Sequence, residues 1–186
     1  MATAAPPAYS PGLEGVIAGE TELSFVNPEL KSLMYRGYDI RDLADNCCFE
    51  EVAYLMLHGN LPNKSQLDDF KAVLVKERAL PSEVKEAMKA FPKTVHPMDS
   101  LRGAVALLAL HDAEVTDGSH EANVRKAVRL LAKIPVIVAN NHRLAEGMDW
   151  NNGDDSLGHG ANFLFMLNGQ APDAETAKLF DYKLLI

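Results

Sequence analysis

The sequence predicts a mainly helical protein with a small β element near its amino terminus. Apolar residues recur at helical spacing through most of the chain after residue 49, whereas short strand-like runs are confined to residues 13–36. Apolar residues make up 47% and charged residues 24% of the 186 positions, which is typical of a globular protein. This length fits about one domain and needs neither disulfides nor a metal to form a core.

The β element is expected in three short runs. Residues 13–18 and 22–26 have strand-like composition and are separated by a turn at 19–21, and residues 33–36 add a third run that ends at Gly37. We expect residues 1–11, rich in small residues and proline, to form a flexible tail. Residues 12–186 then form one domain.

Helix start and stop signals divide the next part of the chain. One or two helical turns are expected at 39–46, followed by a helix from Phe49 to His58 that Gly59 terminates. Asn63 can cap the following helix, and Ser82 can cap a shorter one that runs to residue 91.

Two longer segments stand out because they are apolar around most of their circumference. A helix near 97–111 carries one charge in its ten middle residues, and a helix near 120–147 contains Pro135, which predicts a kink. A helix of this kind is covered on more than one side, here by a second copy of the chain. The candidate interface residues are Met98, Leu101, Val105, Leu108, Val124, Val128, Leu131, Pro135 and Val138.

The last two helices are expected at 161–167, ending near Gly169, and at 174–186, capped by Asp173. The apolar stripe of the second one stops at Ile186 without a glycine, a proline or a polar cap. An exposed apolar stripe invites association, so we expect this helix to continue in a longer polypeptide.

Charge and cysteine usage exclude several classes of protein. The chain has 18 basic and 26 acidic residues, a net charge of −8, which disfavours binding to nucleic acid or to an anionic membrane. The longest uncharged apolar stretch, 134–141, is far shorter than a membrane span. Cys47 and Cys48 are adjacent and suit a reducing compartment, and no targeting segment is evident, so a cytoplasmic protein is expected.

The candidate motifs for metal binding and catalysis lack the residue spacing that their chemistry requires. His120-Glu121 begins a zinc-protease motif, but Val124 stands where the second histidine belongs. A calcium loop read from Asp149 lacks the required glycine and glutamate positions. No phosphate-binding or nucleophile-elbow motif is present. Scattered histidines therefore do not predict a metal site.

Two histidines remain as weak candidates for a catalytic base. His96 precedes a helix start, and His159 lies between two glycines, where we expect it to be exposed and flexible. Asp154-Asp155 is interpreted as charge before a helix start, and either Cys47 or Cys48 as a cap before Phe49. The remaining histidines are expected to lie on polar helix edges or, for His58, in a last helical turn.

A series of segments, taken in order, resembles the amino-terminal half of the citrate synthase family, closest to bacterial-type citrate and 2-methylcitrate synthases. The matching segments are Gly12–Thr21, Tyr35–Ile40, Phe49–Gly59, Leu61-Pro62, His96–Met98, Leu130–Pro135 and Ala161–Leu167. The resemblance implies a multi-helical portion of the family's large domain, incomplete at residue 186.

The resemblance also implies an acyltransferase of the tricarboxylic acid cycle that condenses acetyl-CoA with oxaloacetate, without a prosthetic group, as a homodimer paired through the helices near 97–111 and 120–147. The family's catalytic histidines, aspartate and substrate arginines begin in a His-Ala-Asp-His-Glu stretch expected after Ile186. We therefore expect no catalytic, cofactor-binding or metal-binding residue in these 186 residues and no turnover by them alone. The alternative is a non-catalytic dimerising or regulatory module.

Overall fold

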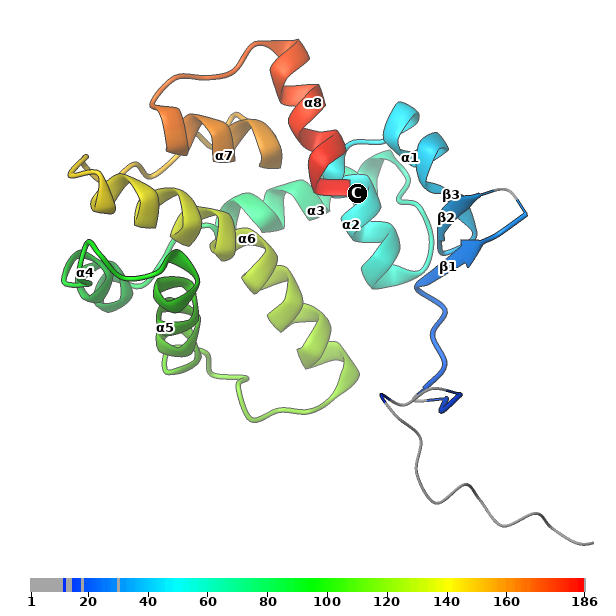
Figure 1. Cartoon of the computed structure of the whole chain (residues 1–186), viewed down its shortest axis with the longest axis horizontal. Coiled ribbons are helices and arrows are strands. Elements are labelled where there is room, and N and C mark those ends of the chain that lie inside the picture. Colours follow the sequence, from blue (N-terminus) through cyan, green and yellow to red (C-terminus); the bar gives the residue numbers. More distant parts are fainter. Residues whose placement is uncertain (1–11, 13–14, 18, 30, 186) are drawn as a thin grey trace, which may run out of the picture.

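The computed structural model describes residues 12, 15–17, 19–29 and 31–185, and these form eight helices and one three-stranded sheet. Figure 1 shows a long bent helix, α6, crossing the molecule, with α4 and α5 on one side and α7 and α8 on another. The sheet, α1 and α2 lie at the far end, and α3 lies between α2 and α6. The predicted mainly helical fold with a small β element is confirmed. The expected tail, 1–11, lies outside the described residues.

The sheet is antiparallel in the order β1-β2-β3, with strands β1 (Ser24–Asn27), β2 (Ser32–Tyr35) and β3 (Tyr38–Asp39). Arg36 and Gly37 have φ angles of 47° and 89°, so they form the two-residue turn between β2 and β3 that suits a twisted hairpin. The runs predicted at 22–26 and 33–36 are thus confirmed within a residue or two, whereas the short β3 carries too little sequence signal to be predicted.

The strand predicted at 13–18 is wrong for residues 15–17, which the structure shows as irregular. Gly15 has a φ angle of +74°, a left-handed conformation that a strand does not use. The other residues of that run lie outside the described residues.

The first helices begin and end at the expected signals. In α1 (Ile40–Asn46), the carboxylate of Asp39 accepts the N–H of Arg41 at 2.9 Å. In α2 (Phe49–His58), the cap position falls on Cys48, whose N–H donates to the carboxylate of Glu51 at 2.7 Å. Gly59 ends α2 with a φ angle of +89°.

The next two helices differ in how closely they follow the expectation. Asn63 caps α3 (Lys64–Glu77) in a reciprocal pair with Gln66, with N···O distances of 2.9 and 3.0 Å. In α4 (Ser82–Lys89) the cap is Pro81, and Ser82 is instead the first helical residue, with its hydroxyl on the carboxylate of Glu83. The helix also ends two residues before the expected position.

The two long helices are confirmed. His96 caps α5 (Pro97–Ala109), its Nδ1 accepting the N–H of Met98 at 3.2 Å, and Ser119 caps α6 (His120–Ala145). Pro135 cannot donate to the helix ladder, and Figure 1 shows that α6 bends along its length. Past its end, Gly147 takes a φ angle of +76°.

Four charged side chains form ion pairs that fasten the connection between α5 and α6 to α6. The guanidinium of Arg129 lies 2.9 Å from the carboxylate of Asp112 and 2.8 Å from that of Glu114, and Arg125 also pairs with Glu114. Hydrogen bonds from Arg125 and then Arg129 lower the pKa of Glu114 to about 2. These ion pairs hold the connection against α6.

The carboxy-terminal pair consists of α7 (His159–Asn168) and α8 (Ala174–Leu185). Gly169 ends α7 with a φ angle of +78°, and the carboxylate of Asp173 accepts the N–H of Thr176 at 2.7 Å at the start of α8. Leu185, in the last described turn, is buried against α1 and α2.

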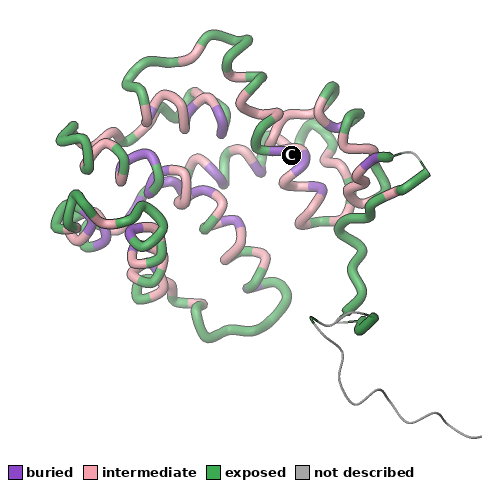
Figure 2. Tube along the Cα trace, viewed as in Figure 1, coloured by how far each residue is buried: buried purple, intermediate pink, exposed green. Residues whose placement is uncertain are grey.

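Three hydrophobic cores surround α6 and α2, and Figure 2 shows the buried positions along these helices. The largest core joins α4, α5 and α7 to the second half of α6 through Val136 and Ile137. A smaller one joins α3 to its first half through Val128 and Ala132. No helix in the described part of the chain is long and apolar enough to cross a membrane.

The loop between α6 and α7 is fixed by the side chain of Asn140, which is fully buried. Its amide donates to the carbonyl of Asn151 at 2.9 Å, and its carbonyl accepts the N–H of Asn151 at 2.8 Å. The side chain thus completes a backbone-like pairing across the loop, which also orders the residues that lead to α7.

We expect Asn140→Ala to lower the free energy of unfolding by about 1–3 kcal/mol, because both backbone groups of Asn151 lose their partner in a buried place. Chemical denaturation followed by circular dichroism measures this. Asn123→Ala is the matched control, since Asn123 is exposed and should change stability by less than about 0.5 kcal/mol. Equal stability of the two variants would contradict the account of the loop.

Candidate functional site

A cluster of polar side chains is buried where α2, α3, α7 and α8 meet. We call Glu50, Arg78, His159 and Asp181 the α7 cluster, because they gather around the amino terminus of that helix. The first three are each less than a tenth exposed, which is unusual for ionisable groups. Buried charge of this kind is either a structural anchor or a reactive site, and the partners of each group decide between them.

The carboxylate of Glu50 binds the amino terminus of α7. Its Oε1 accepts the N–H of His159, the first residue of the helix, at 2.9 Å. Burial alone raises the pKa of Glu50, but hydrogen bonds from the backbone of His159 and of Glu50 itself, with the nearby charge of Lys71, lower it overall. An ionised carboxylate at a helix amino terminus is favourable, so this carboxylate joins α2 to α7.

Asp181 brings α8 against the same end of α7. A side chain at Gly160 would collide with the Oδ1 of Asp181, so the glycine allows the two helices to approach closely. Burial, followed by the charge of Glu50, raises the pKa of Asp181. The two carboxylates therefore lie close enough for the charge of Glu50 to act on Asp181.

His159 differs from the expectation, because the structure buries it. The side chain is 6% exposed and its ring stacks on Phe49 with centroids 4.6 Å apart. Burial, and then the charge of Arg78, lower its pKa to about 4, against the opposing charge of Glu50. In the sequence the flanking glycines indicated flexibility. In the structure Gly160 instead provides the space in which α8 packs closely against α7.

Arg78 anchors the loop that precedes α7. Its guanidinium donates to the carbonyls of Asp154 at 3.3 Å and Leu157 at 3.0 Å, and lies 3.8 Å from the carboxylate of Asp155. Asp154 instead accepts from the hydroxyl and N–H of Ser156, at 2.6 and 2.8 Å. The two aspartates therefore point to different partners and do not form a carboxylate pair.

The groups of the α7 cluster are engaged by the protein itself. The carboxylate of Glu50 holds a backbone N–H, the ring of His159 is stacked, and the guanidinium of Arg78 holds carbonyls. Among the described residues, no group of three or more His, Cys, Asp or Glu side chains is placed to hold a metal ion. The α7 cluster is thus a structural anchor.

The other candidate bases and thiols cap helices or pack against neighbouring side chains. His96 is used as the cap of α5, and the ring of His58 lies tilted by 35° against that of Tyr54, with centroids 4.2 Å apart. The cap before Phe49, left open between two cysteines, falls on Cys48. Burial, then the charge of Glu50, raises the pKa of that thiol to about 12, so it is not a reactive nucleophile at neutral pH. The remaining histidines, His111, His120 and His142, are exposed as expected.

The nine residues predicted for a pairing surface separate into three groups. Leu108 and Val128 are buried in the cores; Leu101, Val105, Val124, Leu131 and Pro135 are half-buried; Met98 and Val138 are exposed. Of the half-buried residues, Leu101 and Val105 pack against the largest core and Leu131 against the core with α3. The structure therefore brings only Met98 and Val138 to the surface as large exposed side chains.

Met98 and Val138 line one groove, of about 870 Å³, between the start of α5 and the second half of α6. Phe91 and Met148 add apolar lining from the flanking loops. Leu110, which follows α5, is 79% exposed but does not line this groove.

Comparison with known proteins gives one consistent result. The family model described as "Citrate synthase, C-terminal domain" matches residues 12–186. The chain is 42% identical to citrate synthase 2 of Bacillus subtilis (strain 168) over 94% of its own length and 47% of the relative's. It is 41% identical to the 2-methylcitrate synthase of Shewanella oneidensis, over 94% of its own length and 46% of the relative's.

A solved structure agrees with the sequence relatives. The crystal structure of citrate synthase from Pyrobaculum aerophilum superimposes with a TM-score of 0.87 at 35% identity, covering 94% of this chain and 46% of that one. The chain thus spans about half the length of the relatives that it matches.

The lowered pKa of His159 predicts that stability falls with acidity. Below the ordinary value of 6.5 the unfolded chain takes up a proton that the folded imidazole refuses until about pH 4. As the pH falls through this window, the free energy of unfolding should therefore decrease by up to about 1.4 kcal/mol per pH unit. Above pH 6.5 the contribution of His159 to stability is complete.

We expect His159→Phe, which keeps a ring against Phe49, to have a shallower slope between pH 6.5 and 4 in chemical denaturation series. His120→Gln is the control, because it removes an exposed imidazole and should leave the slope unchanged. If both variants keep the slope of the parent chain, His159 is not the buried neutral group described above.

Proposed function

The chain belongs to the citrate synthase family, and we propose that it forms the amino-terminal scaffold of an enzyme that condenses acetyl-CoA with oxaloacetate to give citrate in the tricarboxylic acid cycle. The observation that carries the proposal is that the family model matches residues 12–186, while a sequence relative and a solved structure each match 94% of this chain. Acetyl-CoA is a co-substrate of this reaction, and no bound prosthetic group takes part.

The proposed chemistry needs a base beside the acetyl methyl group and cationic groups around the dicarboxylate. The α7 cluster does not offer them, because His159 is buried and stacked while Arg78 holds backbone carbonyls. We therefore assign the reacting groups to polypeptide other than these 186 residues, in the same chain or in another. No residue from 1 to 186 is assigned a catalytic, cofactor-binding or metal-binding role.

The second part of the proposal is a homodimer that pairs through α5 and α6. Its support is the apolar groove of about 870 Å³ with Met98 and Val138 exposed on its walls. Exposed apolar surface of this kind is typical of an association site. Of the other candidates, Leu101 also lines this groove, whereas Val105 packs against the largest core.

The cytoplasm is the proposed location. Cys47 and Cys48 are both free thiols, which suits a reducing compartment. A non-catalytic dimerising or regulatory module is the alternative, and reading the coding sequence past codon 186 separates the two. An in-frame His-Ala-Asp-His-Glu stretch supports the enzyme, whereas a stop codon supports the module.

The 186-residue chain alone should release no CoA from acetyl-CoA and oxaloacetate above background, because the reacting groups are assigned elsewhere. A thiol-detecting absorbance assay measures the release, with citrate synthase 2 of Bacillus subtilis as the positive control. Clear turnover by this chain, abolished by substitution of one of its own histidines, would overturn the assignment.

Val138→Lys should convert a dimer into a monomer, because it places a charge in the groove between α5 and α6. Light scattering on a sizing column should show the mass fall from about twice 20.3 kDa toward 20.3 kDa. Val73→Lys is the matched control, since Val73 is similarly exposed on α3 and should leave the mass unchanged. A parent chain that is monomeric at every concentration, or a dimer unaffected by Val138→Lys, would rule out this surface.

A further inference from the structure

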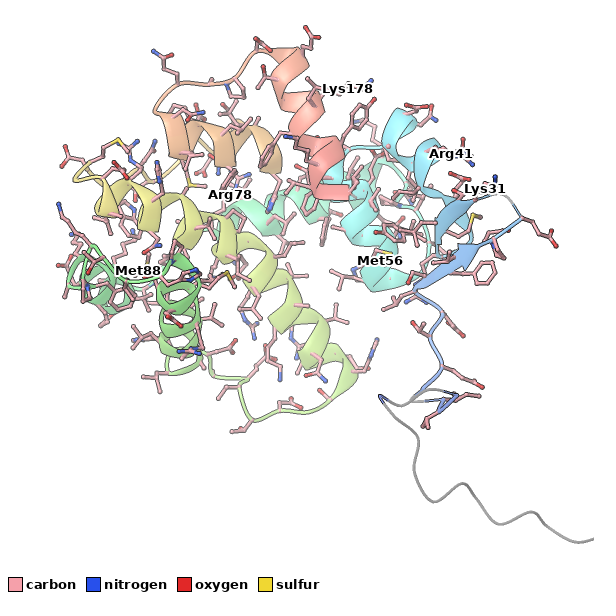
Figure 3. All side chains as sticks on the ribbon, in the orientation of Figure 1. Lys31, Arg41, Met56, Arg78, Met88 and Lys178 are labelled. Atoms are coloured by element: carbon pink, nitrogen blue, oxygen red, sulfur yellow. The ribbon has the colours of Figure 1, made fainter. Side chains whose placement is uncertain are left out.

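A second cavity, of about 300 Å³, lies between the end of α3, the middle of α4 and the loop after α6. Figure 3 labels Arg78 at the end of α3, near the crossing of that helix with α6. The polar side chains that line the cavity are Lys76, Arg78, Lys85, Trp150, Asn152 and Asp155. Only Arg78 is shared with the α7 cluster.

The cavity is locally cationic in an acidic protein. Three of its lining side chains are cations, and Asp155 is its one carboxylate, whereas the whole chain carries a net charge of −8. The pairing of Arg78 with Asp155 is loose, because the two groups are 3.8 Å apart and the carboxylate is 79% exposed. Such an arrangement attracts an anion to this place and repels it from most of the surface.

The two lysines leave most of their charge uncompensated. The ammonium of Lys85 contacts only the neutral Oδ1 of Asn152, at 3.4 Å, and the ring of Trp150, at 5.6 Å from the centroid. Within the described residues, neither Lys85 nor Lys76 forms an ion pair. Both ammonium groups therefore have donors left for an acceptor in the cavity.

Trp150 borders the cavity with its ring. The ammonium of Lys85 lies 5.6 Å from the ring centroid, so the indole reports on the position of that cation. The indole Nε1 has no hydrogen-bond partner among the described residues, but it is buried and does not open into the cavity.

We propose that this cavity binds a phosphate group, held by the ammonium groups of Lys76 and Lys85 and bordered by Trp150 and by Arg78, whose guanidinium keeps its backbone carbonyls. A phosphate carries close to two negative charges at neutral pH and presents several acceptor oxygens in different directions, which matches donors that come from α3, α4 and a loop. The inference concerns a site separate from the proposed groove between α5 and α6 and does not depend on the proposed reaction.

Trp150 is the single tryptophan of the chain, so its fluorescence reports on this cavity alone. Titration with inorganic phosphate, at an ionic strength kept constant with sodium chloride, should give a saturable change in emission, because the bound anion draws the ammonium of Lys85 away from the ring. Sodium chloride alone should give no saturable change.

Lys85→Gln should weaken the apparent affinity by about tenfold or more, since one charged donor is lost. Lys89→Gln is the matched control on the same helix, where Lys89 pairs with Glu86 outside the cavity, and it should bind like the parent chain. If Lys85→Gln fails to fold by circular dichroism, Lys76→Gln tests the same loss from an exposed position.

Glycerol 3-phosphate in a second titration distinguishes the source of the phosphate. Tighter binding than inorganic phosphate indicates a phosphate carried by a larger molecule, and weaker binding indicates the free ion; both support the site. Absence of a saturable response to either compound overturns the proposal, and so does a response that survives unchanged in Lys85→Gln and Lys76→Gln.

Discussion

Helix α6 determines how the rest of the structure packs, because its two halves supply buried side chains to two different cores. Val128 and Ala132 in the first half pack with α3, whereas Val136 and Ile137 in the second half pack with α4, α5 and α7. Pro135 lies between them, and the missing N–H lets the helix bend at the place where its burial changes partners. One bent helix thus joins layers that would otherwise be separate.

The polar anchor at the start of α7 depends on the same arrangement. Once α6 holds α7 in place, the carboxylate of Glu50 can reach the N–H of His159, and α8 can pack on Gly160 with Asp181 beside it. Burial of these charges is tolerated because each meets a backbone group or an opposite charge. The strongest pKa shift of an imidazole in the chain is therefore a consequence of packing, and not a sign of catalysis.

Local signals in the sequence predicted most of the fold. Caps at Asn63 and Asp173 and the glycines after α2 and α7 fix helix ends within a residue or two, because capping chemistry acts over three or four residues. The clearest error comes from a long-range contact. His159 was expected to be exposed because glycines flank it, but its ring stacks on Phe49, which is far away in sequence. Leu108, a candidate for the pairing surface, is buried in the core that joins α4, α5, α6 and α7. Which apolar face is used internally cannot be derived from periodicity alone.

We propose that these helices supply support and pairing, and that the groups that make bonds lie in other polypeptide. The most direct measurement is NMR of the imidazole groups of the six histidines during titration with oxaloacetate. The account predicts that no imidazole signal shifts saturably, because the buried ring is stacked and the others cap helices, lie in a last helical turn or face solvent. A saturable shift that disappears when one of those histidines is substituted would show that this chain grips the substrate itself, and would contradict the account.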